Sequence, residues 1–328
     1  MPTKIAVTIG DINGIGPEVI LKSLLHFQDV EDAEFILFGP KDAYTYWIQK
    51  LRFLDSSDFF ANDENSIRIA EPDNLPSVSF SIGNPTSTSG AIAAKSLTKA
   101  VEMALAGEVD AIVTAPISKY ALQQAGYPHP GHTEFLSELS GGNTPVMLMV
   151  TGDVRIAVAT THVPLKDVPE LITYELLTDR VLVLHHELVD RFGIEAPRIA
   201  LTALNPHAGE NGKIGREEIE TISDVVIELQ KQGLHVSGPY PADAIFARLN
   251  MNKLQDAYLA MYHDQGLIPF KMLSRGKGIN YTCGLPFIRT SPDHGTAFDI
   301  AGQNKADESS MMEAIQIAIS HGSYSKRS

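Results

Sequence analysis

Short apolar runs that alternate with helical patterns are the feature that most constrains the fold of this chain. Strand-like runs rich in Val, Ile and Ala occupy residues 4–10, 34–39, 110–116, 145–152, 155–162, 198–205 and 257–263. Several show little apolar–polar alternation, as strands do when both faces of their sheet are covered. Helical patterns occupy residues 17–27, 89–107, 118–125, 166–192 (with a break), 213–232 and 308–321. This alternation predicts an α/β protein.

The bulk composition limits the class of protein. A chain of 328 residues is long enough for about two lobes. Its net charge of -14 argues against nucleic acid as a partner, because phosphate backbones require a dense Lys/Arg surface. No apolar run approaches the roughly 18 residues that span a bilayer, and the start MPTKIAVTIGDING lacks the layout of a signal peptide. With Cys283 as the only cysteine, we expect a cytoplasmic protein without disulfides.

Histidines recur where predicted strands end. His162 in ATTHVPL, His207 in ALNPHAGE and His263 in AMYHDQG each close an apolar run and precede turn residues. Ligand sites of open α/β sheets form beyond the carboxyl ends of strands. A single histidine there is commonly structural and bonded to a backbone carbonyl. Three imidazoles with open positions for substrate or water instead indicate a divalent-metal site of the catalytic type.

Other polar side chains suggest what such a metal would act on. Lys271 follows the His263 segment, Asn280 lies in KGINYTCGLP, and Arg289 lies in LPFIRTSPDHG. A lysine charge, an amide and a guanidinium can together hold a phosphate or a carboxylate. Simple solvation at the surface is the alternative for Lys271 and Arg289, but Arg289 lies in an apolar stretch. His132 in PGHTEF begins a further predicted helix.

Two glycine-rich segments fit no nucleotide-binding motif by spacing. GDINGIGPE (10–18) lacks the third glycine of G-x-G-x-x-G and is no G-x-x-x-x-G-K-[ST] loop. It is expected to form a tight strand-to-helix turn, with Pro17 in the first helical turn. By spacing alone, DHGTAFDIAGQ (293–303) is a helix cap followed by a glycine.

Together these motifs resemble one enzyme family. GDINGIGPE, GHTEFL, TTHVPL, LNPHAGE, MYHDQGLIPFK and GLPFIRTSPDHGTAFDIAG occur in the order and spacing of the 4-hydroxythreonine-4-phosphate dehydrogenases of vitamin B6 biosynthesis. The resemblance implies the two-lobed fold of isocitrate and isopropylmalate dehydrogenases, with a cleft between the lobes, rather than a Rossmann fold. The first lobe is then expected at residues 1–135 and 285–328, and the middle lobe at 136–284.

The resemblance also implies roles for individual residues. The metal ligands are His162, His207 and His263, one of them contributed across the interface of a homodimer. The substrate contacts are His132, Thr133, Lys271, Asn280 and Arg289. The adenosine-binding loop comprises His294, Gly295, Thr296, Ala297 and Asp299. Asp243 and Asp264 either orient ligand imidazoles or share the general-base role with the other candidates, His132 and Lys271.

The implied reaction is the oxidation of 4-phosphohydroxy-L-threonine at its secondary hydroxyl by NAD and a divalent metal, with decarboxylation to 3-amino-2-oxopropyl phosphate. NADP in place of NAD, and zinc, magnesium, manganese or cobalt as the metal, stay open. Ile12 and Asn13 replace the Pro-Ala usual in the first motif, and Ala244 replaces a common Thr. A paralogous dehydrogenase of threonate or erythronate 4-phosphate is therefore the alternative, and a non-catalytic metal- or phosphate-binding protein is a third hypothesis.

Overall fold

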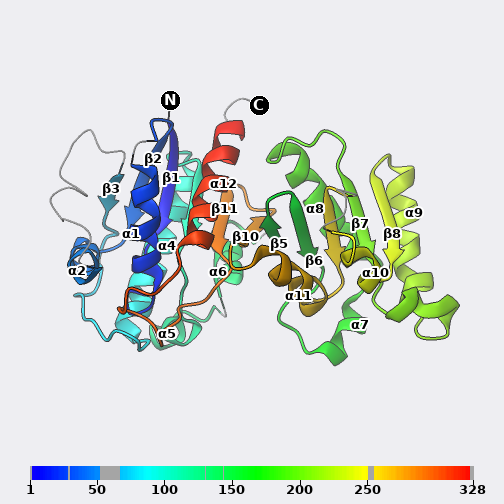
Figure 1. Ribbon diagram of the computed structural model, residues 1–328, viewed down its shortest axis with the longest axis horizontal. Helices are drawn as coiled ribbons and strands as arrows, with labels where there is room; N and C mark the ends of the chain where they lie inside the picture. The colour runs from blue at the N-terminus through cyan, green and yellow to red at the C-terminus, as the bar shows by residue number, and fades with distance from the viewer. Residues whose placement is uncertain are drawn as a thin grey trace. The chain divides into compact units, whose positions relative to one another are not determined.

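Two compact units make up the chain. The computed structural model describes residues 2–28, 30–51, 67–129, 131–142, 144–249 and 255–325. Its internal contacts group Met1–Thr144 with Leu285–Ser328 as unit 1, and Pro145–Gly284 as unit 2 (Figure 1). The family resemblance implies that the first part of the first lobe ends near residue 135. Helix α6 (His132–Leu139) extends further, and its Phe135 and Leu136 are buried in the core of unit 1.

Unit 1 is a parallel sheet with helices on its faces. Its strands are β1 (Thr3–Thr8), β2 (Ala33–Phe38), β3 (Ile67–Ala70), β4 (Ala111–Thr114) and β11 (Ile288–Pro292), in the order β3-β2-β1-β4-β11. Its helices are α1 (Gly16–Leu24), η1 (Leu25–Phe27), α2 (Lys41–Leu51), α4 (Ser87–Leu105), α5 (Lys119–Gln124), α6 and α12 (Ser309–Ser325). All of the paired strands run parallel.

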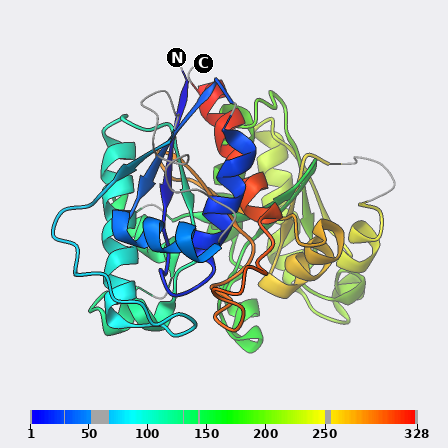
Figure 2. The ribbon, with the colours of Figure 1, turned by 60° about the vertical axis from the view of Figure 1, so that its left-hand side comes forward.

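Burial in unit 1 explains why its strands lack alternation. β4 is buried at every position, and β1 and β2 at all but one. Helix α4 contacts β1, β2 and β4, while α12 contacts β1, β4 and β11 and lies beside α1 (Figure 2). Side chains buried from both sides must be apolar throughout, so the period-two pattern disappears.

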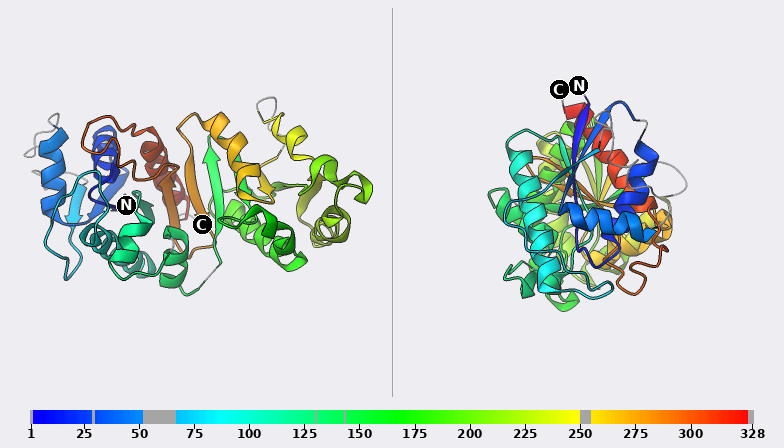
Figure 3. Two further views of the ribbon diagram at one scale, coloured as in Figure 1. Left: turned by 90° about the horizontal axis from the view of Figure 1, so that it is seen from below. Right: turned by 90° about the vertical axis from the view of Figure 1, so that its left-hand side faces the viewer.

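Unit 2 is a mixed sheet. Its strands are β5 (Val146–Thr151), β6 (Val154–Val158), β7 (Arg198–Thr202), β8 (His235–Tyr240), β9 (Ala257–Ala260) and β10 (Ile279–Cys283), in the order β10-β5-β6-β9-β7-β8. Its helical segments are η2 (Leu165–Asp167), α7 (Val168–Leu171), α8 (Tyr174–Asp190), η3 (Pro206–Gly212), η4 (Glu218–Ile222), α9 (Ser223–Lys231), α10 (Ala242–Phe246) and α11 (His263–Ser274). In the view from below, α8 and α9 lie on one face of these strands and α10 and α11 on the other (Figure 3).

Strand direction in unit 2 determines where its loops gather. β5 runs antiparallel to β6 and β10, but β6, β9, β7 and β8 are successive parallel neighbours. The segments that follow β6, β9 and β7 therefore leave the sheet at the same edge. These segments carry His162, His263 and His207, respectively.

The sequence located some elements and missed others. Each of the seven apolar runs contains a strand, and the expected break in 166–192 falls between α7 and α8. The strands β3, β8, β10 and β11 were missed because they are short or carry polar residues, Gly or Pro. The helix expected at 213–232 begins only with η4 at Glu218, and the segment expected as a strand mouth near His263 is the first turn of α11. Within the described residues, none of the helices combines the length and apolarity needed to cross a membrane.

A close approach of two helices in unit 1 depends on one glycine. A Cβ added at Gly90 of α4 would lie 2.0 Å from the carbonyl oxygen of Ala121 in α5. We expect Gly90→Ala to lower the free energy of unfolding by about 2 kcal/mol or more. This loss would occur although alanine is favoured over glycine inside a helix by about 1 kcal/mol.

Urea titration followed by circular dichroism measures this effect. Gly295→Ala is the matched control, because an added Cβ there meets no atom within 4 Å. A Gly90→Ala midpoint at or above that of the unmodified chain would show that α4 and α5 separate without cost.

Candidate functional site

A pair of histidines lies at the edge of unit 2 where parallel strands end. His162 follows β6, and His263 is the first residue of α11, directly after β9. Their ring centroids are 5.9 Å apart, with an angle of 41° between the ring planes. Both side chains line a pocket of about 280 Å³ together with Thr161, Val163, Leu165, Val168, Tyr262 and Asp264. The structure thus brings together two of the three predicted metal ligands.

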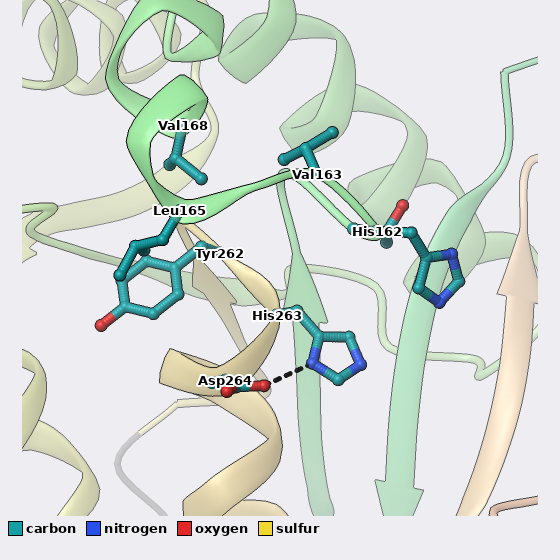
Figure 4. A pocket seen from close by; sticks show the side chains of 8 residues that line it. His162, Val163, Leu165, Val168, Tyr262, His263 and Asp264 are labelled. Atoms are coloured by element: carbon teal, nitrogen blue, oxygen red, sulfur yellow. Dashed lines mark hydrogen bonds and ion pairs between the residues drawn. The ribbon is translucent and has the colours of Figure 1, made fainter.

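Asp264 orients the imidazole of His263. Its Oδ1 lies 2.7 Å from Nδ1 of His263, and the second ring nitrogen is turned toward His162 (Figure 4). A carboxylate beside Nδ1 favours the tautomer with hydrogen on that nitrogen, which leaves a lone pair on Nε2 for a metal. This contact suits the orienting role considered for Asp264. Asp243 lies exposed on α10 and does not line the pocket of the two histidines.

Gln265 fixes the start of α11 against two strand ends. Its Oε1 accepts hydrogen bonds from the Met261 amide and from the Thr202 hydroxyl, both at 2.7 Å, and its Nε2 donates to the Ala203 carbonyl. One amide side chain thereby joins the carboxyl ends of β9 and β7. Sequence reasoning gave Gln265 no role, because an amide two residues after a histidine is no motif.

Gly266 serves packing in this unit. An added Cβ would lie 3.0 to 3.1 Å from Ile156, Ala260 and Val158, side chains of β6 and β9. The absence of a side chain at Gly266 therefore lets helix α11 pack closely against the sheet. It keeps His263 near the strand that leads to His162.

His207 lies in a separate, left-handed turn. Residues 207–211 all have positive φ, between 46° and 75°, within η3. Left-handed conformations cost non-glycine residues roughly 1–2 kcal/mol each, so the turn must be held from outside. Asn205 provides this support: its amide and side chain donate to Glu218, and its Nδ2 also donates to Glu217. The two glutamates thus bind the base of this turn.

The third predicted ligand does not join the pair. His207 is exposed and does not line the pocket of His162 and His263. Among the residues that the structure describes, no group of three or more His, Cys, Asp or Glu side chains is arranged to hold a metal ion. His162 and His263 can provide two ligands to a divalent metal ion. The remaining ligands must come from other groups.

Two predicted substrate contacts also lie in unit 2. Lys271 is exposed on α11, about two turns after His263. Asn280 lies on β10, paired with Met149 of β5. Its Oδ1 is enclosed without a hydrogen-bond partner.

A buried cation and a histidine form the second group of predicted contacts, in unit 1. Arg289 on β11 is 1% exposed, and its Nη2 donates to the Thr114 hydroxyl at 2.6 Å. Burial lowers the pKa of Arg289 to about 9, which leaves it charged at neutral pH. Burial, and then the charge of Arg289, hold the pKa of His132 well below its usual value. His132 and Thr133 are the first residues of α6, where backbone N–H groups can bind an anion.

The predicted cofactor loop follows β11 directly in unit 1. His294 Nδ1 lies 3.0 Å from the Gly295 carbonyl, Ala297 has a φ of 39°, and Gly295 is exposed. Gly295 has open space around its Cα, since an added Cβ would meet nothing within 4 Å. Thr296 and Asp299 complete the loop, and the Asp299 carbonyl accepts a bond from Gln303.

Three predicted site residues are among those described residues that bury a polar side-chain atom without a hydrogen-bond partner. His132 Nε2, Asn280 Oδ1 and His294 Nε2 are each buried without a hydrogen bond. Leaving such an atom unpaired costs about 1–3 kcal/mol, so folding alone does not favour it. A bound ligand could supply the missing hydrogen-bond partner at each of these three atoms.

A family model, sequence relatives and a solved structure all match this chain and belong to the same family. A sequence model described as "Pyridoxal phosphate biosynthetic protein PdxA" matches residues 29–318. The 4-hydroxythreonine-4-phosphate dehydrogenase of Sulfurihydrogenibium sp. is 40% identical over 321 residues, covering 96% of this chain and 97% of the relative. That of Aquifex aeolicus is 41% identical, covering 97% and 98%. The crystal structure of the Klebsiella pneumoniae enzyme of that name matches with a TM-score of 0.85 and 35% identity over 98% of each chain.

The electrostatic effect of Arg289 on His132 predicts a titration shift. In Arg289→Met the repulsion from the guanidinium is gone, so we expect the pKa of His132 to rise while it stays below the ordinary value because of burial. NMR titration of the His132 ring nitrogens measures this, with Lys305→Met as a control for the loss of a distant, exposed charge. An unchanged or lower pKa of His132 in Arg289→Met would contradict the electrostatic account.

Proposed function

This chain belongs to the PdxA family of pyridoxal phosphate biosynthetic proteins, and we propose that it oxidises 4-phosphohydroxy-L-threonine with NAD. The hydroxyl oxygen loses its proton, and the carbon that bears it loses a hydride, which passes to NAD. The resulting ketone lies β to the carboxylate, so the carbon–carbon bond to the carboxylate breaks and carbon dioxide leaves. A proton then adds at carbon to give 3-amino-2-oxopropyl phosphate. The observation that supports this most is the oriented pair of His162 and His263.

The histidine pair is the proposed metal site of the enzyme. A bound divalent metal would lower the pKa of the substrate hydroxyl and favour hydride loss to NAD. Asp264 keeps Nε2 of His263 available as a ligand by bonding Nδ1. Gln265 holds the start of α11 in register with the strand ends, which limits movement of the ligand. Histidine ligands suit zinc, and magnesium, manganese or cobalt suit the site where substrate oxygens complete the coordination.

Several charged and polar residues are proposed to bind the substrate. Arg289 is held by Thr114 in a fixed orientation and stays charged at neutral pH, as binding of a phosphate or carboxylate requires. The first turn of α6 adds the backbone N–H groups of His132 and Thr133. Lys271 and Asn280 are the further contacts that the family resemblance assigns. His132 is neutral near pH 7, so its ring can accept a proton as well as donate one.

A homodimer would complete the metal site. The described residues of one chain provide two clustered histidines, while His207 stands on a rigid left-handed turn elsewhere. We infer that His207 of the partner subunit is the third ligand. The strain of residues 207–211 and their support by Asn205 are consistent with a turn that is built to present a side chain to another surface.

Several finer assignments are proposals from the family resemblance. These are the isocitrate-dehydrogenase-like architecture, the choice of NAD over NADP, the adenosine-binding role of residues 294–299 and a cytoplasmic location. The alternative substrates, threonate and erythronate 4-phosphate, are less favoured because the curated relatives carry the name of the amino-acid enzyme.

Turnover of defined substrates tests the proposed reaction. We expect NADH formation at 340 nm with 4-phosphohydroxy-L-threonine, its loss with EDTA and its return with added zinc or magnesium. D-threonate and D-erythronate 4-phosphates, assayed in parallel, should react at least about tenfold more slowly in kcat/KM, because neither carries the amino group. Turnover of the sugar acids alone would assign the chain to a paralogous reaction, and turnover of none would contradict a dehydrogenase.

Mixing two inactive variants tests the shared metal site. His162→Ala removes the pair but keeps His207, and His207→Ala does the reverse, so each homodimer should lose at least about a hundredfold in kcat. After the two are unfolded and refolded together, half of the dimers are mixed and each carries one intact site. We therefore expect roughly one quarter of the unmodified activity to return.

A second mixture provides the matched control. His162→Ala with His263→Ala should stay inactive, because both changes disrupt the same side of the site. No recovery in the first mixture, despite mixed dimers in native mass spectrometry, would show that all ligands come from one chain.

A further inference from the structure

The loop between β1 and α1 buries two polar side chains. Asp11 is 1% exposed and Asn13 is fully buried. Gly10, with a φ of 69°, lets the chain turn against the carbonyl of Pro116, which also accepts the Asp11 amide. Burying a carboxyl group is unfavourable unless hydrogen bonds replace water. The loop must therefore gain something specific from Asp11.

Asp11 bonds both its own loop and helix α4. Its Oδ1 accepts the Asn13 amide at 2.9 Å, and its Oδ2 accepts the Ser89 hydroxyl at 3.0 Å. Ser89 also belongs to the capping box of α4, in which the Thr86 side chain accepts the Ser89 amide. Burial raises the pKa of Asp11 to about 6 against the effect of these bonds. Asp11 thus fixes the loop to the start of α4.

The fixed loop in turn holds residues 294–302. The Ile15 amide donates to the Thr296 carbonyl at 2.9 Å. Gly14 makes this approach feasible, because an added Cβ would lie 2.8 Å from the same carbonyl oxygen.

Asn13 adds an indirect connection to the same segment. Its Oδ1 and its backbone carbonyl accept the amides of Ser81 and Gly83, respectively. A Cβ on Gly83 would in turn lie 3.0 Å from the carbonyl of Phe298. Residues 294–302 are therefore braced from two directions by contacts that begin at Asp11.

We propose that Asp11 and Ser89 are positioning residues for dinucleotide binding: they hold the loop 294–302 in its binding conformation through Asn13, Gly14 and Ile15. The inference rests on the proposed role of residues 294–299 in binding NAD. The residues present fit such a group, because His294 Nε2 is enclosed without a partner and Gly295 leaves room for close approach. A loop held before binding loses less entropy when the dinucleotide binds.

Substitutions at both ends of the bond test the proposal. Asp11→Ala and Ser89→Ala should each raise the Kd for NADH by about tenfold, measured by the fluorescence of bound NADH without substrate. With saturating NAD, kcat and the KM for the phosphorylated substrate should stay within about twofold of the unmodified values. Asp11→Asn should restore the Kd to within about threefold, because its amide can accept from Asn13 and donate to Ser89.

Ser96→Ala is the matched control. Ser96 lies on the same helix and is equally buried, but its hydroxyl has no hydrogen-bond partner. Its Kd for NADH should equal that of the unmodified chain. A merely structural role for Asp11 would lower the fraction of active protein in Asp11→Ala and leave the Kd of the remainder unchanged.

The outcomes distinguish failure of the positioning role from failure of the proposed function. If the unmodified chain binds NADH and both Asp11→Ala and Ser89→Ala bind it equally well, the positioning role is wrong and the proposed function stands. If the unmodified chain binds neither NADH nor NADPH, the proposed function fails and the positioning role with it. Should Asp11→Ala not fold, Ser89→Ala and Asp11→Asn decide the question alone.

Discussion

The parallel pairing of β6, β9 and β7 is the constraint on which the site of unit 2 depends. Because these neighbours share a direction, the segments that follow them leave the sheet at one edge. Gln265 then joins the ends of β9 and β7, and Gly266 lets α11 lie close against β6 and β9. A slip of one residue in this register would turn His263 to the other side of its segment and separate it from His162.

Unit 1 buries several charged or polar side chains at a cost in folding stability. Arg289 and Asp11 are charged or ionisable side chains with almost no exposed surface, and His132 and His294 each enclose a nitrogen without a partner. None of these features stabilises the fold as much as apolar packing would. An anion or a dinucleotide bound as proposed would supply partners for the two histidine nitrogens, so we interpret their burial as stability given up for preorganised recognition.

From the sequence, the ends of buried strands could be located better than the geometry of the side chains that follow them. Buried strands such as β4 were found because apolar runs without alternation are typical of covered parallel sheets, whereas β10 and β11 were hidden by the polar residues Asn280 and Arg289. The pairing of His162 with His263 was predictable, since both follow strand ends. The left-handed turn at His207 was not, because it depends on Asn205 meeting Glu217 and Glu218, contacts that no local spacing reveals. Gln265 and Asp11 were missed for the same reason: their bonds to Thr202 and to Ser89, respectively, join segments that lie far apart in the sequence.

Anomalous X-ray diffraction from crystals grown with zinc, recorded on both sides of the zinc absorption edge, tests the central claim most directly. The account predicts one strong peak at about 2.0–2.1 Å from an imidazole nitrogen of both His162 and His263, with His207 of the partner subunit as the next ligand. A zinc peak elsewhere, with both imidazoles of the pair left uncoordinated, would contradict the assignment of this pocket as the metal site.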